Sequence, residues 1–152
     1  MILLTPDILA ALRANDIARR VCGQDDARFD PHPVVKLFNP VGAATWLATE
    51  LYEDGDTLFG LADLGFGCPE LGTFSLSEIA AVRLTYGLGI ERDLGFEPRC
   101  SLSMWTQWAR RAGSILWAET LLRRAAARSA DPSREASVSP DLPIRSGKPD
   151  GG

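Results

Sequence analysis

Hydrophobic and polar positions follow a helical period at the start of the chain. Residues 5–7 read TPD, which supplies an N-cap residue, a proline for the first turn and an early acid, and so predicts a helix start. Apolar residues then recur in one stripe through Leu12. The pair Asn15 and Asp16 predicts the end of this helix. The polar, proline-containing segment 22–33 predicts a loop.

From residue 34 the apolar pattern changes to a period near two, which is typical of strands. Four short strands are predicted in chain order, at 34–38, 45–52, 57–62 and 71–74. The letters EDGD between the second and third strands are the best hairpin signal in the chain, and the glycine-rich LGFGCPELG predicts a loop before the fourth. Residues 90–94 predict either a last strand or an extended lead-in to the next helix.

Helical signals return after the strands. The letters SLSE at 75–78 fit a capping box and predict a short helix over 76–83. From Ser103 the apolar positions recur at helical spacing as far as Ala125. Gly113 lies inside this stretch, where it can bend or divide the helix.

These elements together predict an α+β fold. We expect an N-terminal helix, a small antiparallel β-meander of three to five strands, and helices packed on one face of the sheet. Residues 1–128 are expected to form a single domain. Residues 129–152 are rich in proline and serine and poor in large apolar side chains, which predicts a disordered C-terminal tail.

Cysteine and histidine usage narrows the chemistry. The chain has three cysteines with no CxxC pair and one histidine, His32, a composition that favours reduced thiols and no structural zinc or His-rich metal site. The longest apolar runs fall short of the roughly eighteen residues that a membrane span needs. We therefore expect a cytoplasmic protein that does not enter a membrane and that has no resident metal or cofactor.

Charge is distributed unevenly around a net value of −4. Residues 29–97 hold three basic groups against eleven acidic ones, a local balance of −8, which argues against a phosphate-binding face there. Residues 99–128 hold six arginines against a single acid, Glu119. Two arginine pairs in this segment form either a solvated helix face or a contact for a partner or nucleic acid. These pairs are Arg110 with Arg111, and Arg123 with Arg124.

Trp46 and Glu50 are the first candidates for a binding site. Residues four apart share a face in a regular strand and in a helix, so the two side chains are expected to lie together. An aromatic ring beside a carboxylate could bind a base or a cation. The alternative is a core tryptophan beside a carboxylate that is satisfied by a neighbour such as Lys36.

Three other acidic positions could carry chemistry. In an extended segment Glu91 and Asp93 share one face and could hold a hard cation, whereas Arg92 could form a buried bidentate pair that fixes this segment to the sheet. Glu70 is expected to project from the glycine-rich loop. Glu50 completes the set of candidate catalytic carboxylates, and Lys36, Trp46 and Arg92 are the candidate binding residues.

Nucleophilic catalysis finds little support in the sequence. There is no GxSxG motif, and no base or orienting acid is evident beside any cysteine or beside His32. This absence favours a protein that is not an enzyme.

Three segments carry a family resemblance: PVVKLFNPVGAATWLATEL, DTLFGLADLGFGCPELGTFSLSEI and GLGIERDLGF, in that order. They resemble the bacterial family known as domain of unknown function 2958, over about residues 3–117. The resemblance implies an accessory protein of mobile DNA, such as conjugative plasmids and integrative elements, and it implies no known activity and no catalytic residue. The matching polar positions are Lys36, Trp46, Glu50, Glu70, Glu78, Glu91, Arg92 and Asp93. The segment after Ile115 lies outside the usual pattern.

Three functions remain open from the sequence. The favoured one is a non-enzymatic accessory protein of mobile DNA that binds a protein partner, with a role in evading host defence as one form of it. The second is a carboxylate-based enzyme built on Glu50, Glu70, Glu91 and Asp93, with or without a divalent metal. The third is nucleic-acid binding through the arginine-bearing C-terminal helix.

Overall fold

The computed structural model describes residues 2–23 and 25–130. The chain divides into two compact units, Met1–Glu119 and Thr120–Gly152, and the boundary falls within the last helix. The predicted single domain over 1–128 therefore stays a prediction, and the predicted tail at 129–152 lies almost entirely outside the described residues. The elements are α1 (Pro6–Cys22), β1 (Val35–Phe38), β2 (Thr45–Leu51), β3 (Thr57–Asp63), β4 (Glu70–Ser75), α2 (Leu76–Ala81), a short 3-10 helix (Thr85–Gly87), β5 (Glu91–Arg92), α3 (Leu102–Ala112) and α4 (Ile115–Ser129).

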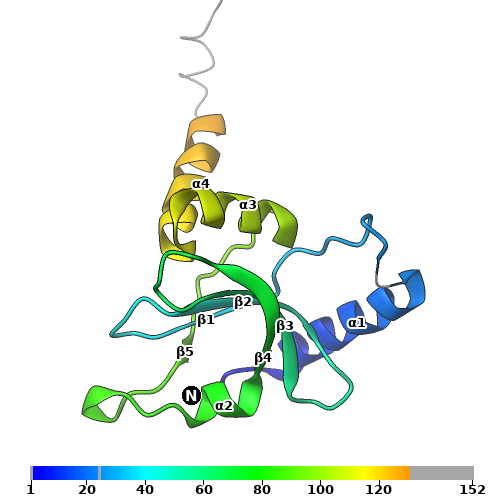
Figure 1. Ribbon diagram of the computed structural model, residues 1–152, viewed down its shortest axis with the longest axis horizontal. Coiled ribbons are helices and arrows are strands. Elements are labelled where there is room, and N and C mark those ends of the chain that lie inside the picture. Colours follow the sequence, from blue (N-terminus) through cyan, green and yellow to red (C-terminus); the bar gives the residue numbers. More distant parts are fainter. Residues whose placement is uncertain (1, 24, 131–152) are drawn as a thin grey trace, which may run out of the picture. The chain divides into compact units, whose positions relative to one another are not determined.

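The five strands form one sheet in the order β4-β3-β2-β1-β5, and every neighbouring pair is antiparallel (Figure 1). Strands β1 to β4 are a meander, and the short β5 joins the free edge of β1. The predicted α+β fold, with an N-terminal helix, an antiparallel sheet and C-terminal helices, is confirmed. The letters EDGD form the turn between β2 and β3 as expected.

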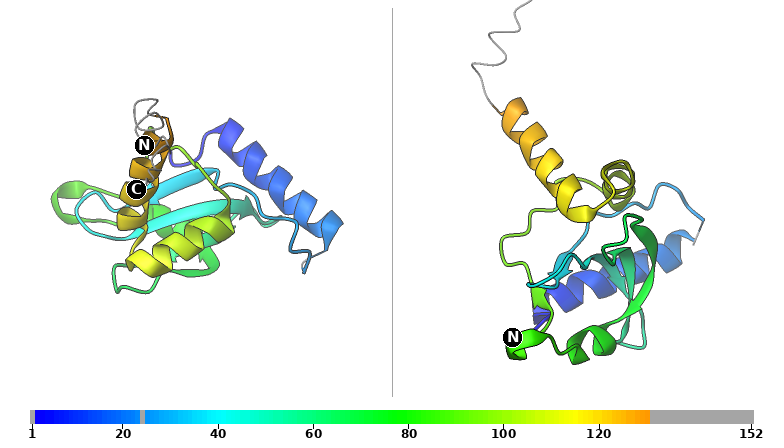
Figure 2. Two further views of the ribbon diagram at one scale, coloured as in Figure 1. Left: turned by 90° about the horizontal axis from the view of Figure 1, so that it is seen from above. Right: turned by 60° about the vertical axis from the view of Figure 1, so that its left-hand side comes forward.

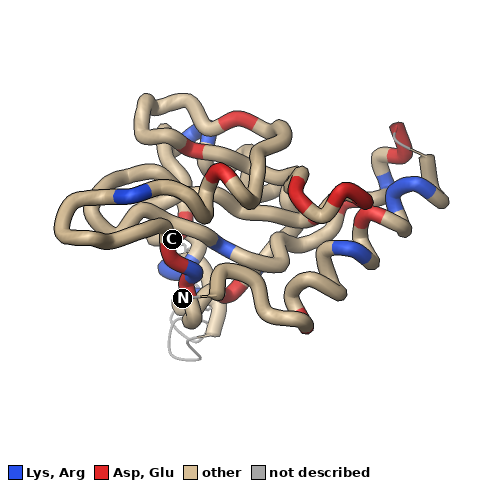
Figure 3. The backbone as a smooth tube through the Cα atoms, turned by 90° about the horizontal axis from the view of Figure 1, so that it is seen from below, with Lys and Arg blue, Asp and Glu red and all other residues tan. Residues whose placement is uncertain are grey.

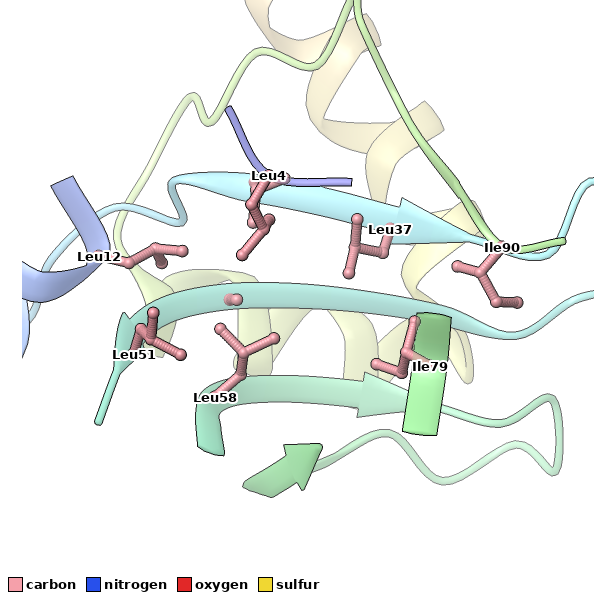
Figure 4. Close-up of a cluster of buried hydrophobic side chains, with 9 residues drawn as sticks. Leu4, Leu12, Leu37, Leu51, Leu58, Ile79 and Ile90 are labelled. Atoms are coloured by element: carbon pink, nitrogen blue, oxygen red, sulfur yellow. The ribbon is translucent and has the colours of Figure 1, made fainter. Parts of the chain in front are cut away.

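One face of the sheet carries the main apolar core. Leu37, Leu51 and Leu58 point from three neighbouring strands into a cluster that also contains Leu12 of α1 and Ile79 of α2 (Figure 4). We call this side the α1 face. Burial of such side chains is the main favourable term in folding, at about 1.5–3 kcal/mol for each large aliphatic side chain.

The opposite face is also covered by helices, where the sequence led us to expect helices on one face. Lys36, Leu47 and Asp63 alternate with the residues of the α1 face, so they point to this second side. The amide of Ile115, at the start of α4, donates a hydrogen bond to Asp63 at 2.9 Å. Figures 1 and 2 show α3 on this side of the sheet, away from α1 and α2.

Helix α1 runs past its predicted end at Asn15 and Asp16 and continues to Cys22, so that prediction was wrong. Tertiary contacts satisfy both of these weak helix formers. The Asn15 side chain donates to the carbonyl of Thr49 at 2.9 Å, and the buried Asp16 carboxylate accepts from arginines of the same helix. The helix ends at Gly23, whose φ of 94° is readily adopted only by glycine.

Strand β2 contains a β-bulge. The register shifts between Ala48 and Glu50, so that Thr49 and Glu50 together face Phe59 of β3. Next to the bulge the two strands approach closely at Gly60, where a Cβ atom would lie 1.8 Å from the carbonyl oxygen of Leu47. A glycine is therefore required at this place in β3.

The predicted long helix from Ser103 is divided at Gly113. This glycine has φ 82° and ψ 0°, a left-handed conformation that ends α3, and its amide bonds to the carbonyl of Ala109. The Ser75 hydroxyl caps α2 as the sequence predicts, by accepting from the amide of Glu78 at 3.2 Å. Asp56 supplies a second acceptor at this helix start, for the amide of Ser77 at 2.8 Å.

Candidate functional site

The four candidate carboxylates do not come together. Glu70 begins β4 and Glu91 begins β5, and these strands form opposite edges of the sheet. Four strand spacings of about 4.8 Å separate the two edges, which places these side chains at least roughly 15 Å apart. First-shell oxygen ligands lie within about 2.6 Å of a cation, so the two residues cannot hold the same ion. Within the described residues no group of three or more His, Cys, Asp or Glu side chains could hold a metal ion.

Trp46 and Glu50 lie on opposite faces of the sheet, so the expectation that they share a face was wrong. Trp46 packs against the core of the α1 face, opposite Leu37 and Ala62. The bulge at Thr49 adds one residue between the two positions and reverses the alternation. Glu50 consequently points to the second face.

Lys36 does not pair with Glu50, which was the sequence-based alternative for that carboxylate. Its buried ammonium group lies 2.7 Å from Glu119 of α4 and 3.1 Å from Asp93, which follows β5. The two carboxylates compensate the buried charge and connect β1 to two segments distant in the sequence. This cluster has a sufficient explanation in the packing of the fold.

Arg92 fixes the N-terminal segment to the last strand. One of its terminal nitrogens donates to the backbone carbonyls of Ile2 at 2.7 Å and Leu3 at 2.8 Å. Glu91 is half-buried and pairs with Phe38 of β1, in the edge strand β5. Arg92 and Asp93 both line a pocket of about 210 Å³, and the Asp93 carboxylate lies 3.1 Å from the ammonium group of Lys36.

Glu50 lines a pocket of about 240 Å³ at the end of α1. Its side chain is buried, accepts from Nε of Arg19 at 2.6 Å and accepts from the Thr49 hydroxyl at 3.3 Å. The Arg19 guanidinium lies over the rings of Phe29 at 4.7 Å and Phe59 at 5.6 Å. The hydrogen bond to Glu50 raises the pKa of Arg19 above its ordinary value.

A second carboxylate, Asp16, stands beside Glu50 in this pocket. Its Oδ2 accepts from Nη1 of Arg13 at 2.8 Å and from Nε of Arg20 at 3.0 Å. Acidic and basic positions are therefore interleaved at this end of the sheet (Figure 3). Sequence reasoning missed these residues, although an aspartate with arginines three before and four after it is a recognisable helix pattern. We call the cavity lined by Asp16, Arg19, Arg20, Glu50, Tyr52 and Phe59 the arginine pocket.

An apolar surface lies at the opposite end of β3, on the hairpin that joins β3 to β4. Leu64 is 56% exposed and Phe66 is 82% exposed. With Ala62, Cys68 and Glu70 they line a pocket of about 220 Å³, which we call the hairpin pocket. Glu70 is the candidate carboxylate of this region, and it lies in strand β4 rather than in the loop expected from the sequence.

The candidate arginines are split between the two units of the chain. Arg110 and Arg111 are exposed in the last turn of α3, where positive charge stabilises the helix C-terminus. Arg123 and Arg124 are exposed on the part of α4 that belongs to the second unit. Nucleic-acid binding through these residues stays a prediction.

Fold and site together define a small α+β domain with an ion-paired pocket at one end of its sheet and an apolar hairpin at the other. The chain belongs to the family described as protein of unknown function (DUF2958), whose model matches residues 3–116, three quarters of the chain. The family resemblance drawn from the three sequence segments is thereby confirmed. Searches among curated proteins and among solved structures found no match. Within the described residues, no helix has the length and apolar character to cross a membrane.

Proposed function

We propose that the protein is a non-enzymatic binding protein that takes up an extended segment of a protein partner at the hairpin pocket. The observation that carries the proposal is the exposure of Leu64 and Phe66 around a concave, partly apolar surface. Large exposed apolar side chains that gather on one surface are typical of protein-interaction sites. The fold gives no other reason for them, because neither belongs to the apolar core.

The edge of the sheet beside this pocket suits an extended partner. Strand β4 pairs with β3 on one side and forms one edge of the sheet. An edge strand presents unpaired backbone groups to which another extended chain can add. Glu70 stands at the start of this strand, next to the apolar residues.

The charge of this region selects a basic partner. Residues 37–82, which include β2, β3, β4 and α2, contain seven acidic residues and no lysine, arginine or histidine. Two of the acids, Glu50 and Asp63, are buried, and the others lie at or near the surface. The partner segment would therefore carry an apolar side chain for the pocket and a basic side chain beside Glu70.

The setting of this interaction follows from the family resemblance. The resemblance implies an accessory role on conjugative plasmids and related mobile DNA, so we propose a host protein as the source of the segment. The evasion of host defence is one form of this role. The separation of Glu70 from Glu91 and Asp93, at opposite edges of the sheet, supports binding over the carboxylate-based enzyme that the sequence left open.

Selection from a random peptide library on the immobilised full chain tests the proposal. We expect enriched peptides with apolar and basic residues in alternation, and saturable binding of one such synthetic peptide by fluorescence anisotropy. Phe66→Ser should lower the affinity for that peptide at least about tenfold, as expected for an exposed aromatic anchor. Glu70→Lys should remove the preference for basic residues.

Val21→Ser is the matched control, since Val21 is 82% exposed, like Phe66, and lies in α1, whose arginines line the pocket at the opposite end of β3. It should leave the affinity unchanged. Failure to enrich any peptide, or equal weakening by Phe66→Ser and Val21→Ser, would overturn the proposal.

A further inference from the structure

The arginine pocket plays no part in the proposed binding of a protein partner. It lies at the start of β3 rather than at its end, and it contains three charged side chains of α1 together with Glu50 of β2. Its walls include the ring of Phe59 and the phenol of Tyr52. A concave site with a few convergent polar groups and an aromatic wall is the usual form of a small-ligand site.

Buried carboxylates fix the positions of two arginines in this pocket. Arg19 donates through Nε to Glu50, and Arg20 donates through Nε to Asp16. Each guanidinium carries two further nitrogens, and these donate no hydrogen bond to another residue in the described part of the chain. The carboxylates thereby fix the orientation of both side chains and leave their outer N–H groups for an external acceptor.

The side chains around Arg19 reinforce this orientation. The rings of Phe29 and Phe59 lie within 4.7 and 5.6 Å of the guanidinium carbon, which restricts its plane. Tyr52 supplies a hydroxyl, and burial, together with the charges of Glu50 and Asp16, raises its pKa, so it remains a donor at neutral pH. The Asp30 carboxylate also acts on Arg19, but it accepts hydrogen bonds from Ser103.

The hydrogen-bonding groups left open in the pocket favour an anion. Two carboxylates, Asp16 and Glu50, and two guanidinium groups, Arg19 and Arg20, line the pocket, and the open groups are the outer N–H donors of the arginines. Both carboxylates are buried and already accept from arginine, so they offer little to an incoming cation. The planar forks of two neighbouring arginines match the oxygens of a phosphate or a carboxylate.

We propose that the arginine pocket binds a small anion that presents a phosphate or carboxylate group to the outer nitrogens of Arg19 and Arg20. The apolar part of such a ligand would lie against Phe59. This site is separate from the hairpin pocket and does not depend on the proposed protein partner.

Isothermal titration calorimetry of the full chain with inorganic phosphate and, separately, with benzoate tests the proposal and distinguishes the two chemistries. We expect saturable binding of at least one probe at one site per chain, at low ionic strength. Arg20→Gln should weaken this binding at least about tenfold, because a charge-assisted hydrogen bond is lost while the fold keeps Arg13 for Asp16. Arg19→Lys keeps the charge beside Glu50 and removes the fork, and it should weaken binding as well.

Arg28→Gln is the control for a general loss of positive charge. Arg28 is highly exposed and pairs with Asp26 in the loop after α1, so its loss should leave the affinity unchanged. Phe66→Ser should also leave it unchanged, which keeps this test apart from that of the partner site. The proposal is overturned if neither probe binds saturably, or if Arg20→Gln and Arg28→Gln weaken binding equally while both variants keep the melting temperature of the parent.

Discussion

The two turns that flank strand β3 differ in polarity. At its start, the turn from β2 is polar, and Asp54 accepts from the amides of Asp56 and Thr57 and from the Thr57 hydroxyl. At its end, the turn to β4 exposes Leu64 and Phe66 and places two glycines, Gly65 and Gly67, at positive φ. One turn is closed by its own hydrogen bonds, and the other presents hydrocarbon to solvent.

This difference separates residues that stabilise the fold from residues that serve something outside it. In the described part of the chain, every hydrogen bond that Asp54 accepts comes from Asp56 or Thr57, so stability is a sufficient reason for its presence. Exposed phenylalanine contributes little to the free energy of folding and increases the risk of aggregation. A side chain that the fold does not need is the better candidate for recognition.

The largest expected effect lies between the two ends, at Gly60. In Gly60→Ala the new Cβ would meet the Leu47 carbonyl at 1.8 Å, so the β2–β3 pairing must move, and we expect a loss of about 3 kcal/mol or more in the free energy of unfolding. Urea denaturation followed by circular dichroism measures it. Gly72→Ala is a matched control, because Gly72 faces Gly60 across the ladder and has open space for a Cβ atom. Equal losses in the two variants would contradict the close approach.

The next largest effect is expected in the arginine pocket, at Glu50. Glu50→Ala removes the partner of Arg19, whose side chain is 23% exposed and so partly hydrated, and we expect a loss of about 2 kcal/mol. The same denaturation measurement applies. Glu53→Ala changes the same charge at an exposed turn position and should cost less than about 0.5 kcal/mol. A negligible effect of Glu50→Ala would mean that the buried pair does not stabilise the fold.

A smaller effect with a distinct pH dependence is expected at Asp54. Its hydrogen bonds with Thr57 and the neighbouring amides lower the pKa of Asp54 from 3.8 to about 2. Because the folded-state pKa lies below the unfolded value, the stabilisation is complete above pH 3.8 and is lost as the pH falls towards 2. The melting temperature of Asp54→Asn should therefore lie below that of the parent at pH 6 and approach it near pH 2. A difference independent of pH would show that the ionised carboxylate is not responsible.

The smallest effect on stability is expected at Phe66, although its effect on partner binding is expected to be large. Phe66→Ser removes a side chain that is 82% exposed, so the free energy of unfolding should change by less than about 0.5 kcal/mol. Leu58→Ser in the middle of the core provides the contrast and should unfold the protein or destabilise it severely. A large loss of stability in Phe66→Ser would place Phe66 with the scaffold and weaken its assignment to recognition.

Much of the fold could be predicted because local signals agree with it. The TPD and SLSE letters begin helices, EDGD forms a turn, and the alternating segments form strands. The end of α1 was missed because Asn15 and Asp16 are helix breakers in isolation and become acceptable only through contacts with Thr49, Arg13 and Arg20. Such tertiary compensation leaves little trace in the local pattern.

The candidate site was predicted less well, for a geometric reason. Glu50 was identified, but its partner Arg19 comes from a helix 31 residues earlier, and pairing at that distance depends on the fold. Glu70, Glu91 and Asp93 were grouped by residue type, whereas the strand order places Glu70 at the opposite edge of the sheet from the other two. Leu64 and Phe66 were read as part of a loop, and their exposure becomes visible only once the core is known.

The bulge in β2 also constrains how the length of this chain can vary. Deletion of Thr49 would remove the bulge and keep Glu50 opposite Phe59 and Leu51 opposite Leu58, whereas deletion of Leu47, in the regular part of the strand, would turn Trp46 to the second face. The turn between β2 and β3 faces solvent, and an added residue there does not change the face to which the side chains of either strand point. Such an insertion should therefore be tolerated. For members of this family, an alignment gap is therefore expected in the EDGD turn or at Thr49, and not elsewhere within TWLATEL, where the number of residues matters as much as their identity.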